Sequence, residues 1–134
     1  MTIEESLMRY LKSKTAITDL VGNKIYFLRA PVNTTAPYLI MQKISAPREQ
    51  AFISNPGLVI SRIQLTAVDY DYPGVKSIIS ALNTTSVLRD FTGIMGTSGA
   101  QVDYTEFANE VDIEIDPSLN LYGVAADWII SYHE

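Results

Sequence analysis

Four carboxylates at alternate positions are the residues of this chain whose types and spacing could do chemistry. They lie in the stretch NEVDIEIDP, residues 109–117, and are Glu110, Asp112, Glu114 and Asp116. If this stretch is extended, the four acids project from one side, about 7 Å apart, and the intervening aliphatic residues project from the other. Three uses of such a row are open: a metal site, a catalytic carboxylate pair, or a surface kept negative toward a partner or against one.

A metal or catalytic use of the row meets geometric obstacles. Calcium takes six to eight oxygen ligands, but carboxylates at positions i and i+2 of a strand project in parallel and do not converge on one ion. An EF-hand loop counted from Glu110 needs glycine at its sixth position, where Ile115 stands. A glycosidase pair needs a cleft with sugar-stacking aromatics, of which the sequence shows no sign. Two interpretations of the row remain besides chemistry: a strand edge kept charged against aggregation, and a surface that contacts a partner. The alternative to both is a small α+β metal-binding or enzymatic module that uses residues 110–116.

Other catalytic groups are scarce in the sequence. It has no cysteine, and its one histidine, His133, is next to the last residue. It has no Gly-x-Ser-x-Gly motif, and the glycine-rich stretch FTGIMGTSG, residues 91–99, lacks the Gly-Lys-Ser/Thr ending of a phosphate-binding loop. We therefore expect a protein that is not an enzyme and binds no cofactor.

The charge is unevenly distributed along the chain. Residues 1–89 carry ten Lys and Arg and six Asp and Glu, a net of +4, whereas residues 90–134 carry nine acids and no Lys or Arg, a net of −9. Opposite fields favour head-to-tail docking of two copies, unless the two halves interleave in the fold and neutralise each other. The total of −5 makes the chain a poor non-specific ligand for nucleic acid. No apolar run approaches a membrane span and the first residues do not form a signal peptide, so we expect synthesis in the cytoplasm.

Hydrophobic periodicity indicates which elements position these residues. It predicts helices over 3–12, 15–21 and 72–83, and strands over 24–30, 38–44, 58–69, 100–108 and 121–134. The acidic stretch that follows residue 108 is either strand or extended loop. Runs of consecutive strands predict an α+β fold with a mainly antiparallel sheet and helices on one face, as one domain over residues 1–134.

Two further segments carry candidate contact residues. On the last predicted strand Trp128 and Tyr132 share the core face, while Asp127 is on the other face and is expected to pair with a basic residue of the same or another copy. The segment SAPREQAFISNPG, residues 45–57, combines two prolines with aromatic and basic residues. That composition is typical of docking anchors, and the candidates are Arg48, Glu49, Phe52 and Ile53. The alternative is an ordinary hairpin loop whose phenylalanine folds back on the sheet.

Three local patterns carry a resemblance to a known family. The first is a strand, two prolines and a tyrosine, and the second is a strand that leads into a helix through VDYDYPGVKSI. The third is the acidic stretch followed by LNLYGVAADWIISY. The matching positions are Ile25, Tyr26, Pro31, Pro37 and Tyr38; Gln64, Leu65 and Ile78; and Leu121, Tyr122, Asp127 and Trp128. Over nearly its whole length the chain resembles the tail-completion proteins of tailed phages and prophages, which are tail-terminator or tail-to-head joining proteins. It departs from the family at Gly123, where a larger and often basic residue is expected.

The resemblance implies a non-enzymatic α+β subunit with a curved antiparallel sheet and flanking helices. It implies that copies form a ring, expected to be a hexamer, which caps the head-proximal end of the tail tube. The ring docks to the head-completion or connector protein, and its other partner is the major tail tube protein. Such a protein is located in the virion at the head–tail joint, with no membrane contact, and DNA passes through it without specific binding. Under this hypothesis some of the acids of residues 110–116 face the ring lumen or a basic neighbour. A third hypothesis is a monomeric cytoplasmic adaptor.

Overall fold

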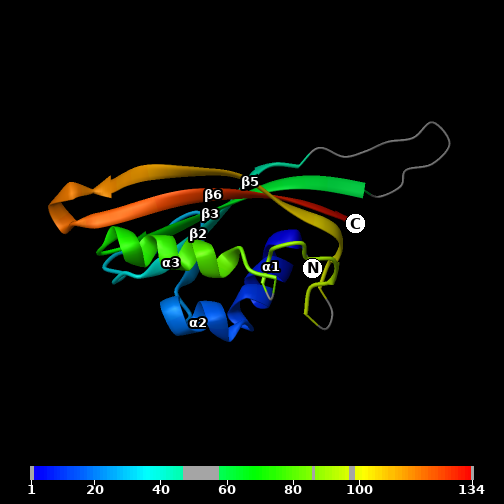
Figure 1. The fold of residues 1–134 in the computed structure, drawn as a ribbon, viewed down its shortest axis with the longest axis horizontal. Coiled ribbons are helices and arrows are strands. Elements are labelled where there is room, and N and C mark those ends of the chain that lie inside the picture. Colours follow the sequence, from blue (N-terminus) through cyan, green and yellow to red (C-terminus); the bar gives the residue numbers. More distant parts are fainter. Residues whose placement is uncertain (1, 47–57, 86, 97–98, 134) are drawn as a thin grey trace.

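The computed structural model describes residues 2–46, 58–85, 87–96 and 99–133, and it places three helices beneath a curved sheet (Figure 1). Within these residues the helices are α1 Ile3–Lys12, α2 Thr15–Val21 and α3 Tyr72–Leu82. The strands are β1 Ile25–Phe27, β2 Tyr38–Ser45, β3 Leu58–Asp69, β4 Gly93–Ile94, β5 Gln101–Asp116 and β6 Leu121–His133, and a 3-10 turn, Pro117–Leu119, joins the last two. The predicted α+β class is confirmed.

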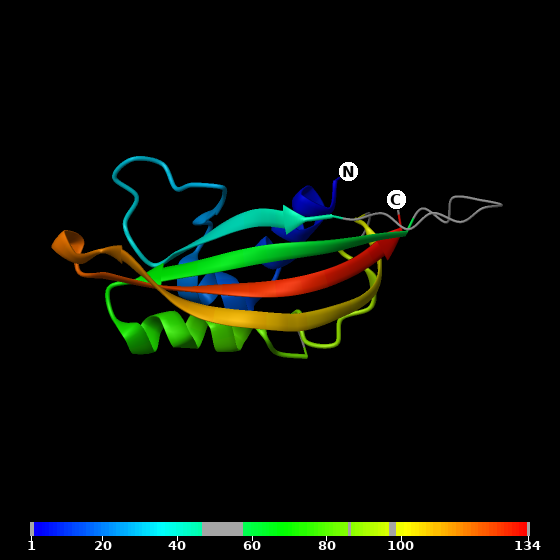
Figure 2. The same cartoon turned by 90° about the horizontal axis from the view of Figure 1, so that it is seen from above.

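The six strands form one sheet in the order β1-β2-β3-β6-β5-β4. Every pairing is antiparallel except that of β1 with β2, which is parallel. The long strands β3, β6 and β5 lie side by side and make up most of the sheet (Figure 2). The β5–β6 hairpin extends past the end of α3, so its turn projects from the body of the protein (Figures 1 and 2).

Two elements differ from the sequence prediction at their ends. The strand predicted over 24–30 is only three residues long, because Leu28 adopts a left-handed backbone with φ of 65° and the chain leaves the sheet there. In the other direction, the predicted strand 100–108 and the acidic stretch after it are one continuous strand, β5. The open question of strand or loop for the acidic stretch is thus answered as strand up to Asp116.

Helices α1 and α3 begin at capping side chains. The Thr2 side chain accepts a hydrogen bond from the backbone N–H of Glu5 at 3.1 Å, and Asp71 Oδ1 accepts from the N–H of Gly74 at 2.7 Å. Pro73 is in the first turn of α3, where a missing N–H costs no helix bond. Among the described residues, no helix has the length and apolar character that crossing a membrane requires.

The core lies between the helices and one face of the sheet. It is built from apolar residues at helical spacing on α1 and α3 and at alternate positions of β3 and β6. Trp128 on β6 is 1% exposed, and its ring packs edge-on against Phe107 with ring centroids 4.9 Å apart. Trp128 and Tyr132 are therefore core residues, as predicted. Burying each large apolar side chain stabilises the fold by about 1.5–3 kcal/mol.

Residues 87–91 extend the helical layer. Tyr10 of α1 donates a hydrogen bond to the carbonyl oxygen of Val87, and its ring lies 4.8 Å from that of Phe91. Burial raises the pKa of the Tyr10 phenol. The neutral, hydrogen-bonded phenol thus joins the first helix to a segment about 80 residues later in the chain.

Candidate interaction surfaces

Two of the four acids, Glu110 and Asp112, lie on the outer part of the sheet, on the face that the helices cover. Glu110 is paired in register with Ala126 and Asp112 with Val124, and both partners belong to the core side of β6. Residues opposite each other in an antiparallel pair point to the same face. The side chains of Glu110 and Asp112 therefore lie on the helical side of β5, beside α3. The backbone of Glu114 and Asp116 belongs to β5, and their side chains lie outside the described part of the structure.

Helix α3 supplies the partners of the two described acids. Lys76 Nζ lies 2.9 Å from Glu110 Oε1 and 4.0 Å from Asp112 Oδ1. The hydroxyl of Tyr72 donates to Asp112 at 3.0 Å, and Lys76 also lies over the Tyr72 ring, 5.4 Å from its centroid. The hydrogen bond to Glu110 raises the pKa of Lys76 above its ordinary value, because the carboxylate favours the charged ammonium. One lysine thus partly neutralises two of the four acids.

These contacts bear on the metal alternative. An ion at Glu110 would have to displace an ammonium group that is already hydrogen-bonded to its carboxylate. Within the described residues, no group of three or more His, Asp or Glu side chains is arranged to hold an ion. The assignment of the row to a ring lumen stays a prediction.

The aliphatic residues that alternate with the acids face the other way, as the alternation predicted. Val111 and Ile113 are 47% and 36% exposed on the face of the sheet opposite α3. Ile113 is opposite Gly123, and a Cβ atom at position 123 would lie 2.7 Å from the Ile115 side chain and 3.1 Å from that of Ile113. A large residue at 123 would require both isoleucines to move. Glycine at 123, where the resembling family has a larger residue, thus leaves room for the side chains of Ile113 and Ile115.

A buried carboxylate lies on the face of the sheet opposite the helices, which we call the open face. Asp127 of β6 is 6% exposed, and its oxygens accept hydrogen bonds from Arg62 Nε at 2.9 Å and from Gln64 Nε2 at 3.1 Å, both from the neighbouring strand β3. A second guanidinium nitrogen of Arg62 lies 2.8 Å from Asp127 Oδ2. The predicted pairing of Asp127 with a basic residue is confirmed within the same chain. The side chains of Asp127, Arg62 and Gln64 thus satisfy one another's hydrogen-bonding groups on the open face.

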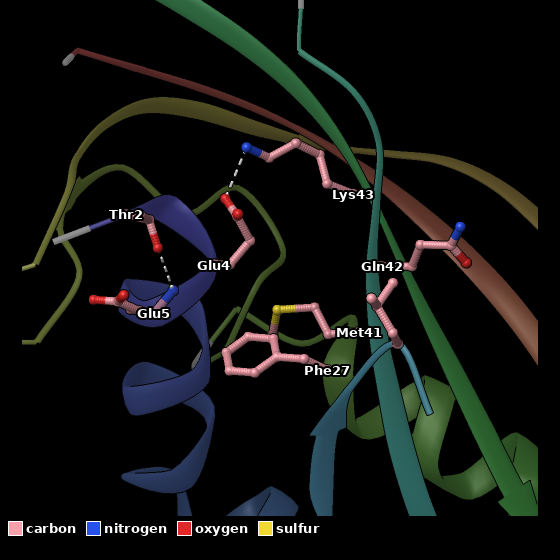
Figure 3. Close-up of a pocket in the computed structure, with 8 residues that line it drawn as sticks. Thr2, Glu4, Glu5, Phe27, Met41, Gln42 and Lys43 are labelled. Atoms are coloured by element: carbon pink, nitrogen blue, oxygen red, sulfur yellow. Dashed lines mark hydrogen bonds and ion pairs between the residues drawn. The ribbon is translucent and has the colours of Figure 1, made fainter. Parts of the chain in front are cut away.

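A groove lies at the opposite edge of the sheet from the acidic row. It has a volume of about 410 Å³ and separates the first turn of α1 from strands β1 and β2 (Figure 3). Its apolar part consists of Phe27, Leu28 and Met41, and Lys43 Nζ closes one side through an ion pair of 2.9 Å with Glu4 Oε1. Phe27 and Leu28 are 46% and 69% exposed, so the groove offers unusually accessible apolar surface.

The other predicted contact residues cannot be placed. Arg48, Glu49, Phe52 and Ile53 lie in residues 47–57, outside the described residues. Sequence reasoning missed the partners Arg62, Gln64 and Lys76, and it missed the groove. The alternation along β3 does place Arg62 and Gln64 on one face, but the sequence does not reveal that β6 is the neighbour of β3.

Comparison with solved structures agrees with the α+β architecture. The fold is similar to that of one chain in a structure described as the virion of a native gene transfer agent (GTA) particle. The TM-score is 0.78 at 8% sequence identity, over 98% of this chain and 95% of that one. At this identity the likeness establishes a common fold. No protein-family model and no curated protein sequence matches the chain.

The Asp127 cluster leads to a stability prediction. Replacing Asp127 with Asn removes the charge that Arg62 and Gln64 bind, and hydrogen bonds to charged groups contribute about 1.5–3 kcal/mol. We expect Asp127→Asn to lower the free energy of unfolding by about 1–2 kcal/mol, since Arg62 remains partly solvated. Urea unfolding monitored by far-ultraviolet circular dichroism measures this change. The exposed Asp19→Asn on α2 is the matched control, and an equally small loss in both variants would contradict the role of the cluster.

Proposed function

We propose that this protein is a structural component of a phage-like particle. The observation that carries the proposal is the fold, which matches a chain of the GTA virion over almost the full length of both chains. The surfaces described above fit this role, because they consist of exposed apolar and charged side chains on a sheet face and two strand edges. In this proposal the protein acts by binding other proteins, and we assign no reaction to it.

Within such a particle we propose the position of a tail terminator or tail-to-head joining protein. The three sequence patterns that resemble this family lie on β1 and β2, on β3 and α3, and on β5 and β6, so they span the sheet and the helix that packs on it. We propose that copies form a ring, a hexamer in this account, at the head-proximal end of the tail tube. One side of the ring would meet the major tail tube protein and the other the head-completion or connector protein.

A role for the acidic row follows from this position. DNA must pass through a ring at the head–tail joint, and carboxylates repel phosphates where lysines would bind them. Strand β5 presents the acids near the outer edge of the sheet, since β4 covers only its first two residues. We propose that the acids of residues 110–116 line the passage, with Lys76 holding Glu110 in place on each copy. The charge of Glu110 is only partly exposed, at 34%, whereas Asp112 is 64% exposed.

The joining role is tested in particles from a strain that lacks this gene. We expect filled heads and separate tails by negative-stain electron microscopy, some tails longer than normal, because nothing would stop tube growth or bind the connector. Expression of the intact chain in that strain should restore complete particles. Complete, infective particles without the protein would contradict the proposed function.

The acidic row is tested by complementing the same strain with the variant Glu110→Gln, Asp112→Asn, Glu114→Gln and Asp116→Asn. We expect joined particles that deliver DNA less efficiently, because phosphates are no longer repelled from the passage. The measurement is the ratio of infective to joined particles. The control removes the same charge from exposed acids elsewhere, at Glu5, Asp19, Asp90 and Glu106. A normal ratio in the first variant would remove the acidic passage from the account and leave the joining role intact.

A further inference from the structure

Strand β5 carries two exposed aliphatic side chains on the open face, Val111 and Ile113, which we call the aliphatic strip. Their partners on β6 are the small residues Ala125 and Gly123, so the surface beside the strip is flat. Within the described residues, β4 covers the outer side of β5 only at its first two residues. The strip is therefore an apolar surface that another protein can reach from the edge of the sheet.

The loop at the opposite edge of the sheet presents a third exposed aliphatic side chain. This loop, residues 28–37, joins β1 to β2, and Val32 within it is 90% exposed. Val32 lies in a turn in which the backbone N–H of Thr34 donates to the Pro31 carbonyl oxygen at 3.2 Å. The Thr34 hydroxyl donates to the same oxygen at 2.6 Å. A turn that is already ordered loses little conformational freedom when it binds a partner.

The loop and the aliphatic strip lie on the same face and at the same end of the sheet. Tyr38, the first residue after the loop, is level with Ile113 through the registers of β2, β3, β6 and β5, so both side chains point to the open face. Ala36 of the loop is buried against Tyr38 on that face. The loop and the hairpin turn project at one end of the molecule (Figure 2). A second copy placed beside β5 in the same orientation would thus bring its loop onto the strip.

The two edges carry opposite charge. Strand β5 has six Asp and Glu and no Lys or Arg, whereas residues 22–45 have three Lys and Arg and no Asp or Glu. Lys43 is paired with Glu4 of the same copy, and Arg29 in the loop is exposed. Because one molecule has both an acidic and a basic edge, a second copy supplies the complementary edge to each of them. Contact of either edge with its own kind would bring like charges together.

We propose that the loop of one copy docks on the aliphatic strip of the next copy. Val32 packs between Val111 and Ile113, and Arg29 lies toward the acidic edge of the same strand. The side chains of Glu110 and Asp112 project from the other side of β5, so the contact leaves them turned to the passage.

This inference deepens the proposed ring and rests on it for the presence of neighbouring copies. The loop and the strip are different surfaces at opposite edges, so each copy uses one toward each neighbour. Such a heterologous contact closes into a ring when the rotation between copies permits.

Engineered cysteines test the contact directly, because the chain has none of its own. The purified double variant Val32→Cys/Ile113→Cys is concentrated and mildly oxidised, and its disulfide-linked species are separated on a non-reducing gel. Each copy bonds to two neighbours if the inference holds, so we expect a ladder from dimers up to a closed ring.

Two controls accompany the double variant. In Val32→Cys/Ser80→Cys the second cysteine is moved to an exposed position on α3, and we expect several times less of every linked species. Adding Val111→Asp to the first variant places a charge in the apolar contact and should reduce the ladder to the level of this control. Far-ultraviolet circular dichroism checks that each variant is folded.

Two results would overturn the inference. A ladder no stronger than the control would leave the loop to another partner, the tail tube or the connector protein. Abundant dimers from Val32→Cys alone or Ile113→Cys alone would show that a surface meets its own kind. Either result, with separate heads and tails in the strain lacking the gene, would leave the joining role standing. A strong ladder together with complete particles in that strain would retain the contact between copies and remove the joining role.

Discussion

The covering of the sheet on one face only is the constraint on which the rest of this structure depends. Helices α1 and α3 and residues 87–91 bury one face, and in the described part of the chain no helix covers the other face (Figure 1). Polar groups on that open face have to be satisfied by their neighbours in the sheet. Asp127 does so through Arg62 and Gln64. The result is a sheet whose buried carboxylate on that face is paired within the sheet, and whose face and two edges carry no helix in the described part of the chain.

The two edges of the sheet differ in chemistry: one is acidic and the other lies beside an apolar groove. At one edge β5 carries the acidic row, of which Glu110 is held by Lys76 from α3. At the other edge β2 ends beside an apolar groove and an ion pair between Lys43 and Glu4. A molecule with unlike edges associates head-to-tail more readily than face-to-face, and this is the geometry that a ring requires.

Local sequence patterns predicted most helices and strands, because the signal for each lies within a few neighbouring residues. Thr2 and Asp71 begin their helices, and the alternation around Trp128 identified its buried face. The neighbours in the sheet could not be read in this way, because strand order depends on contacts between distant segments. Asp127 was therefore predicted to need a basic partner without Arg62 being identified. The groove was missed because it arises where Leu28 leaves the sheet, and a positive φ at leucine has no sequence signal. The uneven charge was informative, although Lys76 shows that the basic and acidic parts also meet inside one copy.

The central claim is that this protein acts through contacts between copies at one end of a tail. Electron cryomicroscopy of complete particles tests that claim most directly, because it resolves the number and arrangement of copies at the head–tail joint. The account predicts a single closed ring of this fold there, with β5 toward the central passage. A joint built without this chain, or one that contains isolated copies with no contact between them, would contradict the account.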